Sequence, residues 1–203
     1  MKNIYIILIL FLSFTIYSCA KKSDSSSTTS ASYASKIDNA TASGSITVGS
    51  EALSGTYNSV CLSYPSDYPP SSTDSFGTSL TVTSNSSYVE TVNYYSDSSC
   101  TSTDGYVSSY YDNVTIGSAV DANYKLTTTL TKLGLKPSTS SFKTHLDGMY
   151  YSSISTTTVG SESAFSYGRS YFKLINVTAT TVKLAKSSVD YPTSLGDSQE
   201  LVK

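Results

Sequence analysis

The feature that most constrains the fold is a series of short strand-like runs that recurs along the chain. Stretches rich in Tyr, Thr, Ser and Val alternate with turn residues, and this pattern predicts β-strands joined by tight turns. Most of the connections have hairpin length, which favours an up-and-down antiparallel sheet, and closing such a sheet removes its exposed edges. The prediction is an all-β domain with one antiparallel barrel of about eight strands. The strands are expected at residues 54–64, 78–83, 87–95, 105–116, 123–131, 149–157, 169–177 and 180–186.

The composition agrees with strands and leaves little for helices. The chain has 18 Tyr and 6 Phe but no Trp, and Tyr, Thr and Val favour pleated, half-buried surfaces. A helix is expected only around Ser138–Leu146, directly after Pro137.

The N-terminus has the layout of a secretory signal peptide. A charged start is followed by an apolar run, Ile4–Ile16, which is shorter than the roughly 20 residues that span a bilayer. The run ends in Tyr-Ser-Cys-Ala at residues 17–20, which resembles the bacterial lipobox. That resemblance implies cleavage before Cys19 and a diacylglycerol on its sulfur, and two or three acyl chains anchor a protein stably. The alternative is an ordinary signal peptide with an incidental cysteine.

The predicted domain boundaries follow from this N-terminus. Residues 1–18 are assigned to the signal peptide, residues 19–50 to the lipidated cysteine and a flexible tether, and residues 51–203 to the barrel. The tether assignment rests on the Ser/Thr-rich stretch Ser23–Ser35, which lacks the apolar residues that a core needs. In lipoproteins of this kind an aspartate after the cysteine favours inner-membrane retention. Ala20 stands there instead, so we expect a lipid-anchored protein of the outer membrane, facing the periplasm or the cell surface.

Two further cysteines remain once Cys19 is assigned to lipid. An even pair in an exported domain indicates a disulfide between Cys61 and Cys100, with two unpaired buried thiols as the alternative. Closing a loop of about 40 residues would stabilise the fold by ~4 kcal/mol in the chain-entropy treatment.

Two stretches around these cysteines resemble known sequences. They are GTYNSVCLSY at residues 55–64 and SLTVTSNSSYVETVNYYSDSSCTS at residues 79–102. Together they are similar to uncharacterised bacterial lipoproteins with lipocalin-like domains. They are also similar to the lipocalin-like repeat of an animal membrane-anchored Wnt-inhibitor family, which is down-regulated by the adenomatous polyposis coli protein. The similarity covers roughly residues 54–117.

The resemblance implies roles for several residues. Gly55 and Tyr57 would stand for the Gly-x-Trp start of lipocalin barrels, although this chain has no tryptophan. Tyr95 and Asp97 would form the hairpin before the second cysteine, and the two cysteines would pair. Because lipocalins bind hydrophobic small molecules inside the barrel, the resemblance implies a ligand pocket here as well.

Alternation along the strands suggests which residues would line such a pocket. Successive side chains point to opposite faces of a sheet, so even-numbered residues of a strand share one face. That face is heavy in tyrosine and carries two carboxylates. It either forms an ordinary core with satisfied hydroxyls or lines a cavity for a small apolar or amphipathic ligand. The predicted ligand-binding residues are Tyr88, Glu90, Tyr94, Tyr106, Tyr110, Asp112 and Tyr124.

The sequence argues against several other functions. The formal net charge is −2 and no basic cluster extends beyond Lys21-Lys22, so nucleic acid is not an expected partner. The single histidine, His145, lies beside Asp147, but no Gly-x-Ser-x-Gly nucleophile motif accompanies them. Glu90 and Asp112 could be arranged as a glycosidase pair, but two carboxylates alone do not identify such an enzyme. Neither zinc-type His/Cys clusters nor calcium-loop spacing occurs, so we expect no enzyme, no metal and no cofactor.

Two functions remain open. In the first, the chain is a lipid-anchored binding module that holds a small ligand in the barrel. In the second, it is a non-enzymatic surface or structural lipoprotein with a filled barrel, which binds a protein or glycan through the loops at Tyr64–Ser75 and Thr101–Gly105.

Overall fold

Strands dominate the computed structural model, which describes residues 33–34, 36–65, 72–150, 157–186, 188, 190–196 and 198–203. These residues all belong to the unit Ser32–Lys203. Its elements are β1 (Ile46–Val48), β2 (Glu51–Leu53), β3 (Thr56–Asn58), β4 (Leu62–Ser63), β5 (Ser75–Ser84), β6 (Ser87–Tyr95), β7 (Thr103–Val120), β8 (Asn123–Pro137), α2 (Ser140–Tyr150), β9 (Ser163–Val177), β10 (Thr181–Leu184) and β11 (Glu200–Val202). The predicted signal peptide and Cys19 lie outside the described residues.

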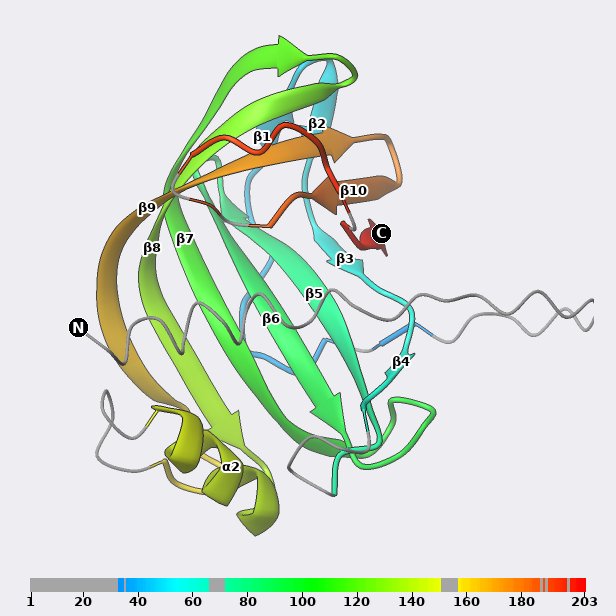
Figure 1. The fold of residues 1–203 in the computed structure, drawn as a ribbon, viewed down its shortest axis with the longest axis vertical. Helices are drawn as coiled ribbons and strands as arrows, with labels where there is room; N and C mark the ends of the chain where they lie inside the picture. The colour runs from blue at the N-terminus through cyan, green and yellow to red at the C-terminus, as the bar shows by residue number, and fades with distance from the viewer. Residues whose placement is uncertain are drawn as a thin grey trace, which may run out of the picture. The chain divides into compact units, whose positions relative to one another are not determined.

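The strands from β3 onward form a closed ring in which all neighbours are antiparallel (Figure 1). Each of β5 to β10 pairs with the next strand in the chain, β11 pairs with β3, and β3 pairs with β5. β4 continues beside β3 along the same edge of β5. The all-β class and the eight-strand antiparallel up-and-down barrel are therefore confirmed.

Local sequence explains the turns and irregularities of the ring. The β5–β6 hairpin turns at Asn85 and Ser86, and the β7–β8 hairpin turns at Asp121, whose φ is +54°. Asn113 has the same positive φ, and the register of β7 against β8 shifts there. Asn and Asp tolerate this left-handed conformation better than other residues with a side chain.

The ring closes with a strand that the sequence pattern did not reveal. A strand was expected at 149–157, but Met149 and Tyr150 are the last residues of α2, and residues 151–156 lie outside the described part. β11 takes the closing place instead. Its pairing with β3 is the single residue pair Val202–Asn58, which is too short to leave an alternating pattern in the sequence.

The predicted helix is confirmed and it caps one end of the barrel. Thr139 Oγ1 accepts the backbone N–H of Phe142 at 3.2 Å, as a helix N-cap does. Thr139 itself donates to the carboxylate of the buried Asp104. Phe142 and Leu146, one turn apart, are fully buried against the barrel. Within the described part of the chain, no helix has both the length and the apolar character that crossing a membrane requires.

Part of the segment predicted as a tether lies on the barrel. The β1–β2 hairpin buries Ile46, Val48 and Leu53 in the core. Ahead of it, the Ile37 N–H donates to Asn93 Oδ1 at 3.3 Å. Ala34 packs so closely over Gly77 that a β-carbon added there would come within 2.1 Å of the Ala34 β-carbon.

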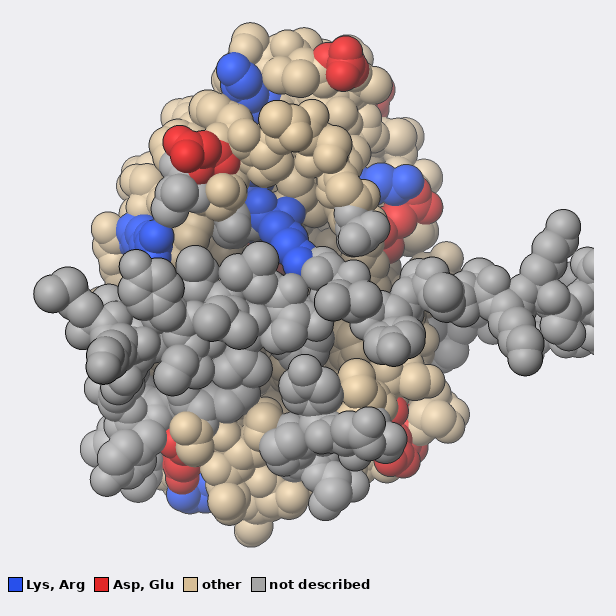
Figure 2. Space-filling model, viewed as in Figure 1, with Lys and Arg blue, Asp and Glu red and all other residues tan. Residues whose placement is uncertain are grey.

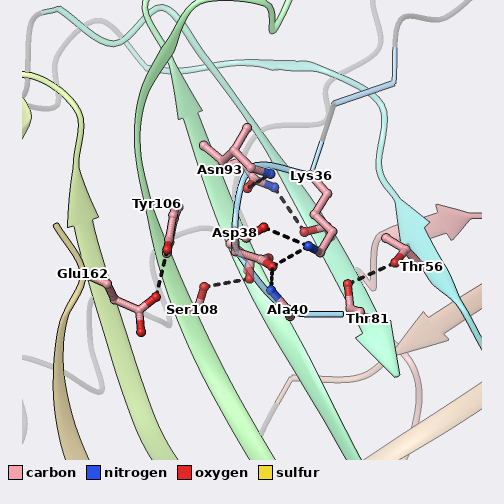
Figure 3. Close-up of polar contacts among 12 residues, drawn as sticks. Lys36, Asp38, Ala40, Thr56, Thr81, Asn93, Tyr106, Ser108 and Glu162 are labelled. Atoms are coloured by element: carbon pink, nitrogen blue, oxygen red, sulfur yellow. Dashed lines mark hydrogen bonds and ion pairs between the residues drawn. The ribbon is translucent and has the colours of Figure 1, made fainter. Parts of the chain in front are cut away.

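The outer face under this segment is polar yet buried. Figure 3 shows residues 36–40 passing over β6. The covered outward side chains are small and hydrogen-bonded to one another, as Thr91 Oγ1 and Ser108 Oγ are at 2.9 Å. They are Ser79, Thr81, Thr91, Asn93 and Ser108. The ordered unit therefore starts before residue 51.

The predicted disulfide is confirmed. Cys61 and Cys100 are bonded, with their α-carbons 5.9 Å apart and a sequence separation of 39. The bond joins the β3–β4 connection to the loop before β7. In that loop Asp97 accepts backbone N–H groups from Ser99, Thr101 and Ser102. These bonds outweigh the opposing desolvation and hold the pKa of Asp97 below its usual range.

The barrel interior contains two apolar clusters. One lies toward the β1–β2 hairpin and is built around Tyr57, Leu80, Val82, Tyr88, Leu126 and Ile175. The other lies against α2 and is built around Tyr64, Tyr94, Val107, Leu133, Leu135 and Phe142. The candidate site lies on the inward face of the strands that join these clusters.

Candidate functional site: a polar layer inside the barrel

The two halves of β9 differ in their neighbours. The residues from Ile175 to Val177 pair with β10, and Ile175 also pairs with β8 on the other side. The residues from Ser163 to Tyr171, which we call the open half of β9, pair with β8 but with no other strand of the described residues. Along most of this half the side chains alternate between exposed and partly exposed. The partly exposed ones point into the barrel, so solvent reaches the interior here.

An ion pair lies inside the barrel next to this half. Lys173 Nζ of β9 lies 2.5 Å from Glu90 Oε1 of β6. Glu90 stands opposite Leu80, and Lys173 opposite Leu126, both fully buried core residues, so both charged side chains point inward. Lys173 is 2% exposed and Glu90 is 24% exposed, which places the pair where the packed core meets the accessible interior.

Aromatic rings surround the ammonium group. Lys173 Nζ lies 4.4 Å from the ring centre of Tyr111 and 5.6 Å from that of Tyr88. The two rings are stacked on each other with centres 5.0 Å apart. Burial opposes the charged form of Lys173, but the Glu90 carboxylate outweighs it, so the pKa of Lys173 lies above its ordinary value. Burial raises the pKa of Tyr88 as well.

A second cation points inward from the open half of β9. Arg169 stands opposite the buried Leu130, and its guanidinium carbon lies 5.4 Å from the ring centre of Tyr171. It is partly buried, and no hydrogen bond or ion pair joins it to another described residue. On its other side Phe165 and Tyr167 lie with ring centres 5.2 Å apart. Figure 2 shows Lys or Arg atoms in a hollow near the middle of the viewed face.

Four of the seven predicted ligand-binding residues point inward. Tyr88 and Tyr124 contact the cluster near the β1–β2 hairpin, and Tyr94 belongs to the cluster against α2. Glu90 forms the ion pair. The barrel brings Tyr88 and Glu90 together around Lys173, while Tyr94 and Tyr124 lie in separate parts of the interior.

The other three residues, all on β7, face outward. The prediction that the even-numbered residues of β7 line the interior is therefore wrong. Tyr88 pairs with Tyr111 and Val89 pairs with Tyr110, which places Tyr110 on the face opposite to Tyr88. Tyr106 and Asp112 lie on that outer face too. The register of β6 against β7 matches even-numbered residues with odd-numbered ones. Because both faces of β7 carry tyrosine, the sequence did not show which face was the inner one.

On the outer face the two tyrosines bind an acid. Tyr106 Oη donates to Glu162 Oε2 at 2.8 Å and Tyr110 Oη donates to Oε1 at 3.3 Å (Figure 3 labels Tyr106 and Glu162). Lys132 Nζ lies 3.3 Å from Glu162 Oε1 and 3.6 Å from the ring centre of Tyr110. Burial, followed by the Glu162 contact, raises the pKa of both tyrosines.

The structure does not place the residues of two catalytic hypotheses, Glu90 with Asp112 and His145 with Asp147, as those mechanisms require. Asp112 accepts a hydrogen bond from Thr131 Oγ1 at 2.7 Å on the outer face, whereas Glu90 points inward, so they cannot flank one bond as a glycosidase pair does. Asp147 accepts from the Thr157 N–H at 2.7 Å and pairs with Lys143. His145 packs against Phe142, and burial lowers its pKa. Among the described residues no group of three or more His, Cys, Asp or Glu side chains is placed to hold a metal ion.

Sequence reasoning missed Arg169, Lys173 and Tyr111. The first two were in a predicted strand, and their alternation with Tyr171 as Arg-x-Tyr-x-Lys puts all three on one face. That spacing could have identified them. Tyr111 could not have been chosen over Tyr110 without the register of β6 against β7.

The fold and the site define a class: an up-and-down β-barrel with a polar layer inside an incompletely covered wall. No protein-family model matches the sequence. No curated protein matches it either. The lipocalin-like resemblance therefore stays a prediction.

Proposed function

We propose that this chain is an exported, lipid-anchored protein whose barrel binds a small amphipathic molecule along the open half of β9. One observation carries the proposal: inward-pointing polar and aromatic side chains remain partly exposed there. They are Phe165, Tyr167, Arg169, Tyr171 and Glu90. A filled, ligand-free core would normally exclude charged groups, since burying an unpaired charge costs several kcal/mol. Aromatic walls with a few polar groups are typical of small-molecule sites.

The location is part of the same proposal. The Cys61–Cys100 disulfide is typical of proteins from an oxidising compartment. The lipobox-like residues before Cys19 supply the membrane anchor, and the outer membrane is the proposed site. Cys19→Ala should release the protein from the membrane fraction or leave it unprocessed. A variant that still partitions into detergent like the parent would contradict the anchor.

The ligand site is tested with the neutral fluorescent probe N-phenyl-1-naphthylamine. The parent protein should bind it saturably. Tyr167→Ala removes an aromatic wall and should weaken probe binding by about tenfold, the equivalent of roughly 1.4 kcal/mol. Tyr33→Ala is the matched control, because Tyr33 is 49% exposed and outside the barrel. Absence of saturable binding would contradict the proposal and favour a filled barrel that meets a protein or glycan partner through its loops.

A further inference from the structure

The charges inside the barrel do not balance. Glu90, Arg169 and Lys173 are the charged residues that point inward from the ring strands. Two cations against one anion leave one positive charge. Since Glu90 lies 2.5 Å from Lys173, that excess belongs to Arg169.

Arg169 is held where a ligand can reach it. Its guanidinium stacks toward Tyr171, and Tyr167 lies two residues away on the same inward face. A guanidinium is always charged and presents a planar fork of donors that matches a carboxylate in two parallel hydrogen bonds. No carboxylate of the described residues occupies that fork.

The surroundings of Arg169 also specify the rest of the ligand. Along β9 the next inward side chains toward α2 are Tyr167 and Phe165, whose rings pack against both apolar clusters. Aromatic rings of this kind bind an apolar body, while the single excess charge binds an anionic end.

We propose that the barrel selects monoanionic amphiphiles, with the carboxylate or equivalent head on Arg169 and the apolar body along Tyr167 and Phe165. This inference rests on the proposed function and specifies its ligand. The Glu90–Lys173 pair positions the site and contributes no net charge. A doubly charged phosphate monoester would leave a negative charge uncompensated inside the barrel, so a single charge fits better.

Displacement of bound N-phenyl-1-naphthylamine tests the inference with three ligands of equal chain length. Dodecanoate should displace the probe at least tenfold more strongly than dodecanol or dodecyltrimethylammonium. Arg169→Gln should reduce dodecanoate affinity by about 10- to 100-fold, as expected for lost hydrogen bonds to a charged group, so that the variant no longer prefers dodecanoate to dodecanol. Arg169→Lys keeps the positive charge and should retain most of the preference for dodecanoate over dodecanol.

The control variant is Lys183→Gln, because Lys183 is exposed and pairs with Glu200 away from the interior. It should change none of the affinities. Equal binding of dodecanoate and dodecanol by the parent protein, or an Arg169→Gln variant that keeps the dodecanoate preference, would overturn the monoanion inference while the binding function stands. Absence of probe binding by the parent would overturn the function itself. Far-UV circular dichroism confirms that each variant is folded, and the preference of the parent protein decides the matter without any variant.

Discussion

The two halves of β9 show how one strand serves two purposes. From Lys173 to Ile175 the strand is buried, and at Ile175 it has a paired strand on each side. In the open half, which is paired on one side only, inward residues remain partly exposed. The same alternation of side chains thus produces a packed core at one end and an accessible wall at the other. The difference comes from the length of β10, which has four residues beside the fifteen of β9.

The largest expected effect comes from removing Glu90, the carboxylate that pairs with the buried Lys173. Glu90→Leu leaves the Lys173 ammonium buried and unpaired, and should lower the free energy of unfolding by about 3–5 kcal/mol. Urea denaturation measures the loss. The double variant Glu90→Leu/Lys173→Met removes both charges and should recover most of it. If Glu90→Leu alone were as stable as the parent, the Glu90–Lys173 pair would not contribute to the stability of the fold.

Truncations in the two halves should differ in cost. Leu80→Ala, in the packed cluster, should lower the unfolding free energy by about 2–5 kcal/mol because it leaves a cavity. Tyr167→Ala, in the open half, should cost only about 1 kcal/mol because the Tyr167 side chain is already partly in water. Thermal or urea unfolding compares the two. Equal costs would mean that the open half is packed as tightly as the core.

The disulfide joins the β3–β4 connection to the loop before β7, where Cys100 packs with Ala34 and Tyr95. Replacing both Cys61 and Cys100 with serine should lower the unfolding free energy by about 2–4 kcal/mol, since a loop of 39 residues is released. Denaturation of the variant against the oxidised parent measures it. Mass spectrometry of unreduced peptides provides the check on linkage, and free alkylated thiols at both positions would contradict the bond.

The smallest effect concerns pH at the α2 cap. Burial lowers the pKa of His145 in the folded protein, and this outweighs the opposing influence of Asp104. The unfolded chain therefore binds a proton more readily, so this contribution to stability is constant above the ordinary histidine pKa of about 6.5 and declines as the pH falls below it. His145→Gln should lose less stability than the parent between pH 7 and pH 5. Identical pH profiles would contradict a buried, neutral His145.

Much of the fold was predictable because it depends on local chemistry. β6 was predicted with its observed bounds, and the strands corresponding to β5, β7, β8, β9 and β10 were located, although their ends were often short. Asn85 and Ser86 are turn-forming residues between two strand-like runs, and they form the β5–β6 turn in the structure. The start of the domain was harder to predict, because Ile37 and the β1–β2 hairpin are held by contacts with distant residues such as Asn93.

The candidate site was only half predictable. Tyr88 and Glu90 were correctly expected to point into the barrel, because three of the five apolar residues of β6 (Tyr88, Val92 and Tyr94) share their parity. Tyr106, Tyr110 and Asp112 were misplaced because β7 has large side chains on both faces and a register shift at Tyr110/Tyr111. The Arg-x-Tyr-x-Lys spacing places Lys173 on one face with Arg169, but its partner Glu90 is 83 residues away, so the sequence did not show the ion pair.

The sequence by itself determined the all-β class, the order of most strands and the cysteine pair, since propensity, turn chemistry and cysteine number are local properties. Only the tertiary structure decided which face of β7 is inside, that β11 closes the ring, and that Arg169 is left without a partner among the described residues. The physical reason is that a period of two separates the faces of a strand without saying which is buried. That choice depends on the register between strands, and so on contacts between residues far apart in the chain.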